Sequence, residues 1–125
     1  MNTKAAAIVA MVGCVLLAAS AVLATETFRK LSGSQIRARL AGMELTDEVH
    51  WREAYELHGS FISRSMGRAR VGQWRVKDDE LCVELADQAD SGCYEVWLAG
   101  TKVELRPTGR GLPVQGVLQK PADRK

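Results

Sequence analysis

The chain has 125 residues, with 17 Lys and Arg against 15 Asp and Glu and a net charge of +2. A balance this close to neutral gives no electrostatic basis for binding nucleic acid, which requires a basic face. The length suits one small domain, and we expect it to span residues 25–119.

Residues 1–24 are predicted to be a secretory signal peptide. Lys4 precedes an uncharged apolar run from Ala5 to Ala24, and small residues at Val22 and Ala24 suit a signal peptidase. One alternative is an uncleaved membrane anchor, since the run is just long enough to cross a bilayer. Another is lipidation at Cys14, which the apolar residues after it disfavour. We therefore expect export to the periplasm, with membrane contact only if this segment is retained.

The first expected element is a short helix over about residues 32–41. Ser32 and Gln35 have the spacing of a capping box, and Gly42 suits the left-handed position after the last turn. A helix this short is marginal alone, so Leu31, Ile36 and Leu40 are expected to dock on something larger.

The segment from Thr46 to Gly59 fits two structures. As a strand it places apolar residues on one parity, with only Glu53 breaking the pattern, and these are Val49, Trp51, Tyr55 and Leu57. As a helix it would begin at Thr46 and end near Gly59. We prefer the strand because aromatic and branched residues share one parity.

Beyond Gly59, turn signals recur every eight to twelve residues, which is typical of a meander of short antiparallel strands. A turn at Asp78 and Asp79 pairs Trp74 with Val83. A turn at Ala99 and Gly100 would pair Val96 with Val103 and set Glu95 opposite Glu104.

The chain is expected to finish with an edge strand around Val114–Leu118 and a disordered tail at 120–125. The fold class is therefore mainly β: a small antiparallel meander or half-barrel, of which a lipocalin-like barrel is one form. The short N-terminal helix would cover an open end.

Two cysteines, Cys82 and Cys93, remain once Cys14 is removed with the signal. An even number in an exported chain predicts one disulfide. Zinc would need further ligands, and the spacing of His50 and His58 fits no common zinc motif. We expect no metal and no cofactor.

Binding residues are sought among the charges and aromatics. Basic residues precede acidic ones between Arg64 and Glu95, which predicts cross-strand ion pairs. In the stretch RSMGRAR, however, Arg68 and Arg70 lie at a turn without acidic neighbours. Trp97 has the parity of Cys93, so it would pack on the disulfide or line an open barrel mouth. Arg68, Arg70 and Trp97 are the candidate binding residues.

No catalytic constellation is found. His58 lies near Ser60, Ser63 and Ser65, but no G-x-S-x-G surrounds them. We expect a non-enzymatic periplasmic binding or interaction module for an envelope protein or a small ligand. The alternatives are a small envelope enzyme or enzyme accessory that uses His58 and the serines, and a membrane-anchored envelope factor.

Several short motifs follow one another along the chain: L-S-G-x-x-I from Leu31 to Ile36, Gly42, Tyr55 to Gly59, G-x-W-x-V from Gly72 to Val76, Leu81-Cys82, C-Y-x-V from Cys93 to Val96, and Gly100. This order resembles a group of small exported proteins of Gram-negative bacteria whose function is unknown. The resemblance implies a periplasmic β-rich domain, of half-barrel or lipocalin-like form, and brings no catalytic residues. The stretch SMGRARVGQWR is more basic than is usual in that group.

Overall fold

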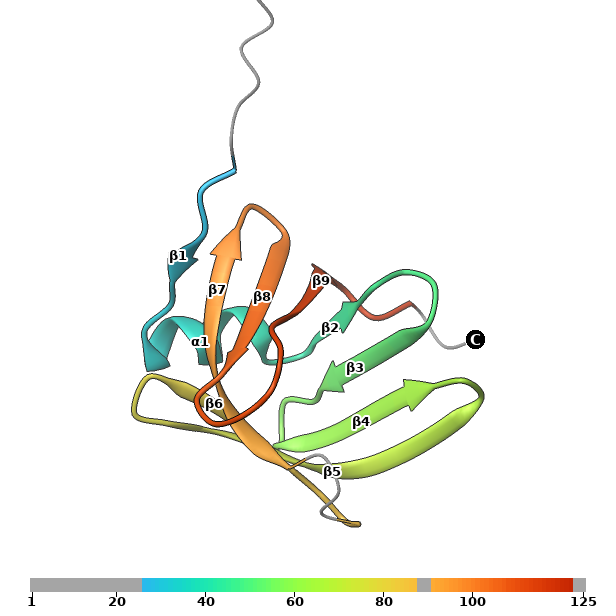
Figure 1. The fold of residues 1–125 in the computed structure, drawn as a ribbon. Coiled ribbons are helices and arrows are strands. Elements are labelled where there is room, and N and C mark those ends of the chain that lie inside the picture. Colours follow the sequence, from blue (N-terminus) through green and yellow to red (C-terminus); the bar gives the residue numbers. More distant parts are fainter. Residues whose placement is uncertain (1–25, 88–90, 123–125) are drawn as a thin grey trace, which may run out of the picture.

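The structure, a computed structural model, describes residues 26–87 and 91–122 (Figure 1). The predicted signal peptide, Cys14 and the last three residues of the predicted tail lie outside this part of the chain. Residues 120–122 lie in an exposed segment after the last strand. No helix in the described ranges is both long and apolar enough to cross a membrane.

The described residues form one helix and nine strands. In chain order these are β1 (Arg29–Lys30), α1 (Gly33–Leu40), β2 (Met43–Thr46), β3 (Trp51–Tyr55), β4 (Ser60–Ser65), β5 (Arg68–Lys77), β6 (Glu80–Leu85), β7 (Gly92–Ala99), β8 (Lys102–Pro107) and β9 (Val114–Gln119).

Strands β2 to β9 form a closed antiparallel barrel. Each strand pairs with the next as far as β8, β8 pairs with β9, and β9 pairs with β2 to complete the ring. The predicted β-meander class is confirmed, and the half-barrel is in fact closed. The sequence predicts β9 as an edge strand, but it pairs with β8 on one side and with β2 on the other, where Leu118 lies opposite Leu45. The short β1 pairs with Trp97 and Leu98 of β7, beyond the residues of β7 that pair with β6.

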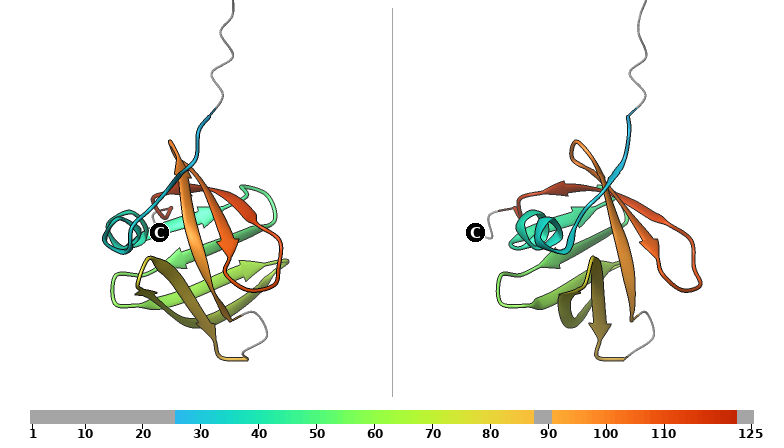
Figure 2. Two further views of the ribbon diagram at one scale, coloured as in Figure 1. Left: turned by 60° about the vertical axis from the view of Figure 1, so that its left-hand side comes forward. Right: turned by 90° about the vertical axis from the view of Figure 1, so that its left-hand side faces the viewer.

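Helix α1 begins and ends as its sequence predicts. The Ser32 side chain accepts from the Gln35 N–H, the Gln35 side chain accepts from the Ser32 N–H, and Gly42 has a φ of 76°. Asp79, from the turn between β5 and β6, accepts a hydrogen bond from the Gly33 N–H at 2.7 Å. Figure 2 shows the helix at one end of the barrel.

The core lies where the helix meets the barrel. Leu31, Ile36 and Leu40 are buried and form one cluster with lumen residues of the strands, among them Leu45, Leu81, Val96 and Val103. The apolar stripe of the helix thus closes this end of the lumen, as the prediction required.

The segment with two interpretations contains a strand, as preferred, but a shorter one. Asp47 Oδ1 accepts from the N–H groups of Val49, His50 and Trp51, so residues 47–50 form a loop and β3 starts at Trp51. Val49 is therefore exposed, and so is Leu57, which lies in the turn after β3.

The two hairpins differ in how well they were predicted. Between β5 and β6, Trp74 lies opposite Val83 and Lys77 opposite Glu80, which confirms the first register. Between β7 and β8 the predicted register is wrong by two residues: Val96 lies opposite Leu105, not Val103. The turn is Gly100-Thr101, with Gly100 at a φ of 62°, so Glu95 lies opposite Arg106 and the predicted like-charge pair does not occur.

Candidate functional site

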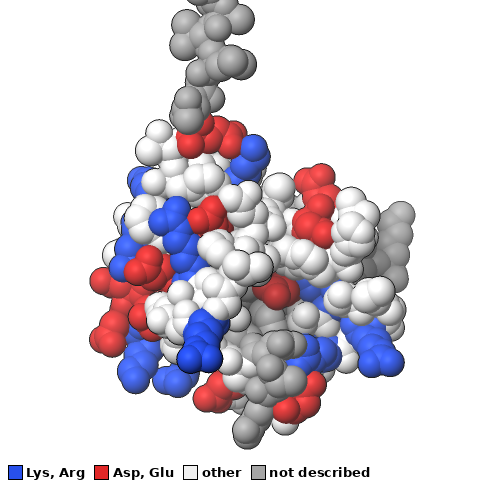
Figure 3. All heavy atoms as spheres, viewed as in Figure 1, with Lys and Arg blue, Asp and Glu red and all other residues white. Residues whose placement is uncertain are grey.

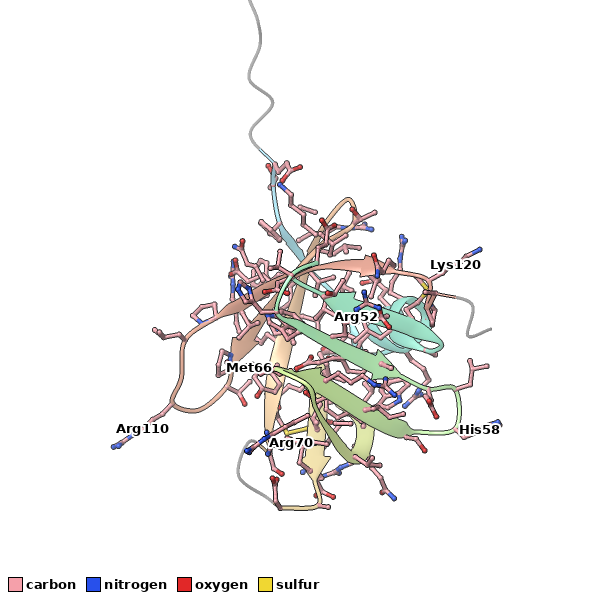
Figure 4. All side chains as sticks on the ribbon, turned by 90° about the vertical axis from the view of Figure 1, so that its right-hand side faces the viewer. Arg52, His58, Met66, Arg70, Arg110 and Lys120 are labelled. Carbon is pink, nitrogen blue, oxygen red and sulfur yellow. A yellow bond between two sulfur atoms is a disulfide. The ribbon has the colours of Figure 1, made fainter. Side chains whose placement is uncertain are left out.

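The end of the barrel opposite the helix is built from four loops. They join β2 to β3, β4 to β5, β6 to β7 and β8 to β9, and residues 88–90 of the third are not described. We call this end the mouth. Figure 4 shows Met66, Arg70 and Arg110 toward this side and His58 on the other.

A pocket of about 240 Å³ opens within the mouth. Its walls come from seven strands, β3 to β9, and combine apolar side chains with a few polar ones. The lining residues are Glu53, Tyr55, Phe61, Ser63, Arg70, Val83, Leu85, Tyr94, Leu105 and Val114. Apolar walls with a few converging polar groups are the usual composition of a ligand site.

Glu53 is the acidic residue of this pocket. It has the inward parity of β3, between Trp51 and Tyr55, and its cross-strand neighbours are Leu45 and Ser63. The Tyr55 hydroxyl donates to Glu53 Oε2 at 2.9 Å. In Figure 3 acidic atoms lie recessed near the centre of the face, in a hollow between the loops.

Burial raises the pKa of the Glu53 carboxyl, and the hydrogen bond from Tyr55 only partly offsets this. The pKa of Tyr55 also lies well above its usual range, because of its own burial and then the negative charge of Glu53, with a smaller effect of Tyr94. A carboxyl group, two phenols and Ser63 therefore meet at the base of the mouth.

Arg70 and Arg68, both predicted binding residues, lie on β5 with inward parity. Arg70 is opposite Ser63, and it holds Asp87 through two contacts: Nε to Oδ2 at 3.1 Å and Nη2 to Oδ1 at 2.7 Å. The expectation that Arg70 lacks an acidic partner is thus wrong, because the antiparallel register returns Asp87 to it. Arg68 is exposed beside Met66, at a shallow depression that continues outward from the pocket.

The rim of the mouth carries exposed apolar side chains. Met66 is 91% exposed, Leu112 84% and Val49 80%, and the three lie on different loops. Single exposed apolar residues are ordinary on a protein surface, but several around one opening are typical of a contact surface.

Trp97, the third candidate, lies elsewhere. It has the outward parity of β7, where the Arg106 guanidinium stacks on its ring at 3.9 Å and its Nε1–H donates to Glu95 at 3.0 Å. Its cross-strand neighbours are Lys30 and Glu104. The structure therefore does not bring Trp97 together with Arg68 and Arg70, and its partners are side chains of the outer wall.

Cys82 and Cys93 form the predicted disulfide and lie directly opposite each other on β6 and β7, with Cα atoms 4.0 Å apart. The carboxylate of Glu80 lies close to both sulfurs. Because both sulfurs are used in the S–S bond, this group is a cross-strand link and not a set of three metal ligands.

The residues weighed for chemistry are dispersed. His58 lies in the turn between β3 and β4, whereas Ser63 and Ser65 point into the mouth at the far end of β4. Ser63 lies three strand positions, about 10 Å, beyond Ser60, where β4 starts, and His58 lies in the turn before Ser60. In the described part of the chain no hydrogen bond links His58 to a serine.

The candidate site residue that sequence reasoning missed is Glu53. In the sequence it is the one residue that breaks the apolar parity of the expected strand. That interruption was itself the signal, because burying a charged side chain at an inward position costs free energy and so indicates a specific role.

Comparison with protein-family models, curated proteins and solved structures finds no match for the chain.

Proposed function

We propose that this protein is an exported, non-enzymatic binding module and that its ligand or partner group enters the barrel through the mouth. The observation that carries the proposal is the inward-facing carboxyl group of Glu53 in a pocket whose walls are largely apolar. Burial of a carboxyl group costs free energy unless it is paired. Tyr55 donates one hydrogen bond to the carboxyl group, but no cation pairs with it among the described residues. A role in binding best explains why a glutamate lies at this inward position.

The rest of the mouth supports the same proposal. One end of the lumen is filled by α1 and the core, whereas the other leaves a pocket bounded by loops. The exposed Met66, Leu112 and Val49 would contact whatever enters the opening.

Export is supported by the disulfide, because such bonds persist in oxidising compartments and are rare in the cytosol. Together with the predicted signal at 1–24, this favours the periplasm. Intact-mass measurement of the exported protein tests the processing: loss of the residues up to Ala24 is expected, and a retained N-terminus would instead support an anchor.

A neutral probe tests whether the mouth binds at all. We expect benzyl alcohol to shift backbone amide resonances around Ser63, Tyr94 and Val114 and to leave the turn at His58 unchanged. The variant Ser63→Leu, which would fill the pocket, should abolish these shifts. Shifts spread over the outer wall, or none at saturating probe, would contradict the proposal.

A further inference from the structure

We propose that the pocket of the mouth receives an alkylammonium group, that is, a primary amine on a short apolar stem, from a free amine or from a lysine side chain. This inference rests on the mouth being the binding site. It names the ligand chemistry from the placement of Glu53 relative to the walls and to the arginines.

The carboxylate of Glu53 is positioned to accept from such a group. Its Oε2 takes the hydrogen bond from Tyr55, and within the described residues Oε1 has no partner. Glu53 is also the sole acidic residue among the described residues that line the pocket. Because no buried side-chain oxygen among the described residues lacks a partner, Oε1 is open to the pocket, where an ammonium group would give it a donor and the carboxylate a counter-charge.

The walls suit the stem of the ligand. Phe61, Val83, Leu85, Leu105 and Val114 surround the space next to Glu53. The volume of about 240 Å³ is smaller than the roughly 300 to 1000 Å³ of sites for drug-sized ligands, so the pocket suits a small group such as a short aliphatic chain.

An anionic ligand fits less well, although two arginines lie at the mouth. Arg70 is committed to Asp87 through two contacts, which offset its charge. Arg68 is exposed at the rim, farther along β5 from the pocket. An anion that entered the pocket would therefore meet the carboxylate of Glu53 before it met an unpaired cation.

The charge of Glu53 also makes the binding dependent on pH. The titratable or charged groups that face it are Tyr55, Tyr94 and Arg70, the last with its partner Asp87. Since an ammonium group pairs with the ionised carboxylate, affinity should fall as the pH drops through the pKa of Glu53. Because burial raises that pKa, the loss should begin at a higher pH than for an exposed glutamate.

The test compares three probes of equal length, pentylamine, pentan-1-ol and pentanoate, by amide chemical-shift titration. Pentylamine should bind at least about tenfold more tightly than the other two at pH 7, as expected for one charge-assisted hydrogen bond. In Glu53→Gln, which keeps the shape, this preference should disappear. In Glu56→Gln, a matched control in the exposed turn between β3 and β4 at the other end of the barrel, it should remain.

A second measurement does not depend on the folding of a variant. The carboxyl ¹³C resonance of Glu53 reports its pKa, which saturating pentylamine should lower and pentan-1-ol should not. A peptide with one central lysine distinguishes the two sources of the amine: tighter binding than pentylamine indicates a protein partner, and exclusion indicates a free amine.

Three results would overturn the inference: preference for pentanoate, equal binding of the three probes, or a preference for pentylamine that persists in Glu53→Gln. If benzyl alcohol still binds at the mouth in these cases, the proposed function stands and only the ligand chemistry is wrong. If benzyl alcohol does not bind there either, both proposals fail.

Discussion

Removal of the disulfide should cost a large part of the stability of the barrel. Cys82 and Cys93 are separated by 11 residues in sequence. In the chain-entropy model, closing a loop of this length lowers the entropy of the unfolded state and so raises its free energy by about 2.8 kcal/mol at 25 °C. Small domains have total stabilities of about 5 to 15 kcal/mol, so the link is a substantial fraction of the whole.

The local sheet makes this pair important as well. Among the described residues three pairs join β6 to β7, and Cys82 with Cys93 is the middle one. Cys82 is 3% exposed and Cys93 is partly exposed, so truncation of both side chains would add a small packing loss. Reduction of the wild-type chain keeps the sulfur atoms and isolates the effect of the covalent bond.

Urea unfolding followed by tryptophan fluorescence measures the difference. We expect the wild-type protein with a reductant to lose about 2.8 kcal/mol, and Cys82→Ala with Cys93→Ala to lose slightly more. The double variant should not respond to the reductant, which is the control. A loss below about 1 kcal/mol on reduction would refute the entropic argument. Two titratable thiols in the exported, denatured protein would refute the bond itself.

Two further predictions concern single residues. A Cβ at Gly72 would lie 2.0 Å from the carbonyl oxygen of Glu84, so Gly72→Ala should lower the free energy of unfolding by about 3 kcal/mol. Gly109 has open space around it, so Gly109→Ala is the control and should change stability little. Equal urea midpoints for the two variants would contradict the prediction. Desolvation disfavours the charge of Asp47, but three backbone N–H groups and His50 outweigh it and hold its pKa well below the usual range. Because the pKa of Asp47 is lower in the folded than in the unfolded state, its ionised carboxylate stabilises the fold at pH values above the unfolded pKa of about 4, and this stabilisation is lost as the pH falls. The difference in unfolding free energy between wild type and Asp47→Asn should therefore shrink between pH 5 and 2. A difference that stays constant over this range would contradict the prediction.

The parts that sequence predicted well are those in which independent local signals agree. For β5 and β6, the turn at Asp78 and the apolar parity of both strands specify the same register. For α1, the capping box and Gly42 specify both ends. In the second hairpin the parity fits two registers equally, since a shift of two residues keeps every side chain on its face.

A further signal could have decided that register. The predicted turn set Glu95 opposite Glu104, whereas the observed one sets Glu95 opposite Arg106 and lets Arg106 cover Trp97. Like charges directly opposite each other are unfavourable, so the repulsion was itself evidence for the other turn. Closure of the barrel by β9 could not be read in this way, because its partners on β2 are more than seventy residues away in sequence.

The candidate site was hidden for a related reason. Alternation assigns an apolar face to the core and treats an inward charge as an error, but a barrel with one open end has inward positions that face a pocket. Glu53, Ser63 and Arg70 are successive cross-strand partners and form one polar row across β3, β4 and β5. Each is a single irregularity in its own strand, and only the register places them side by side. Where local rules fail at neighbouring positions of several strands, the failures are better explained by a shared function than by chance. The row at the mouth is therefore stronger support for a binding site than any one of its members.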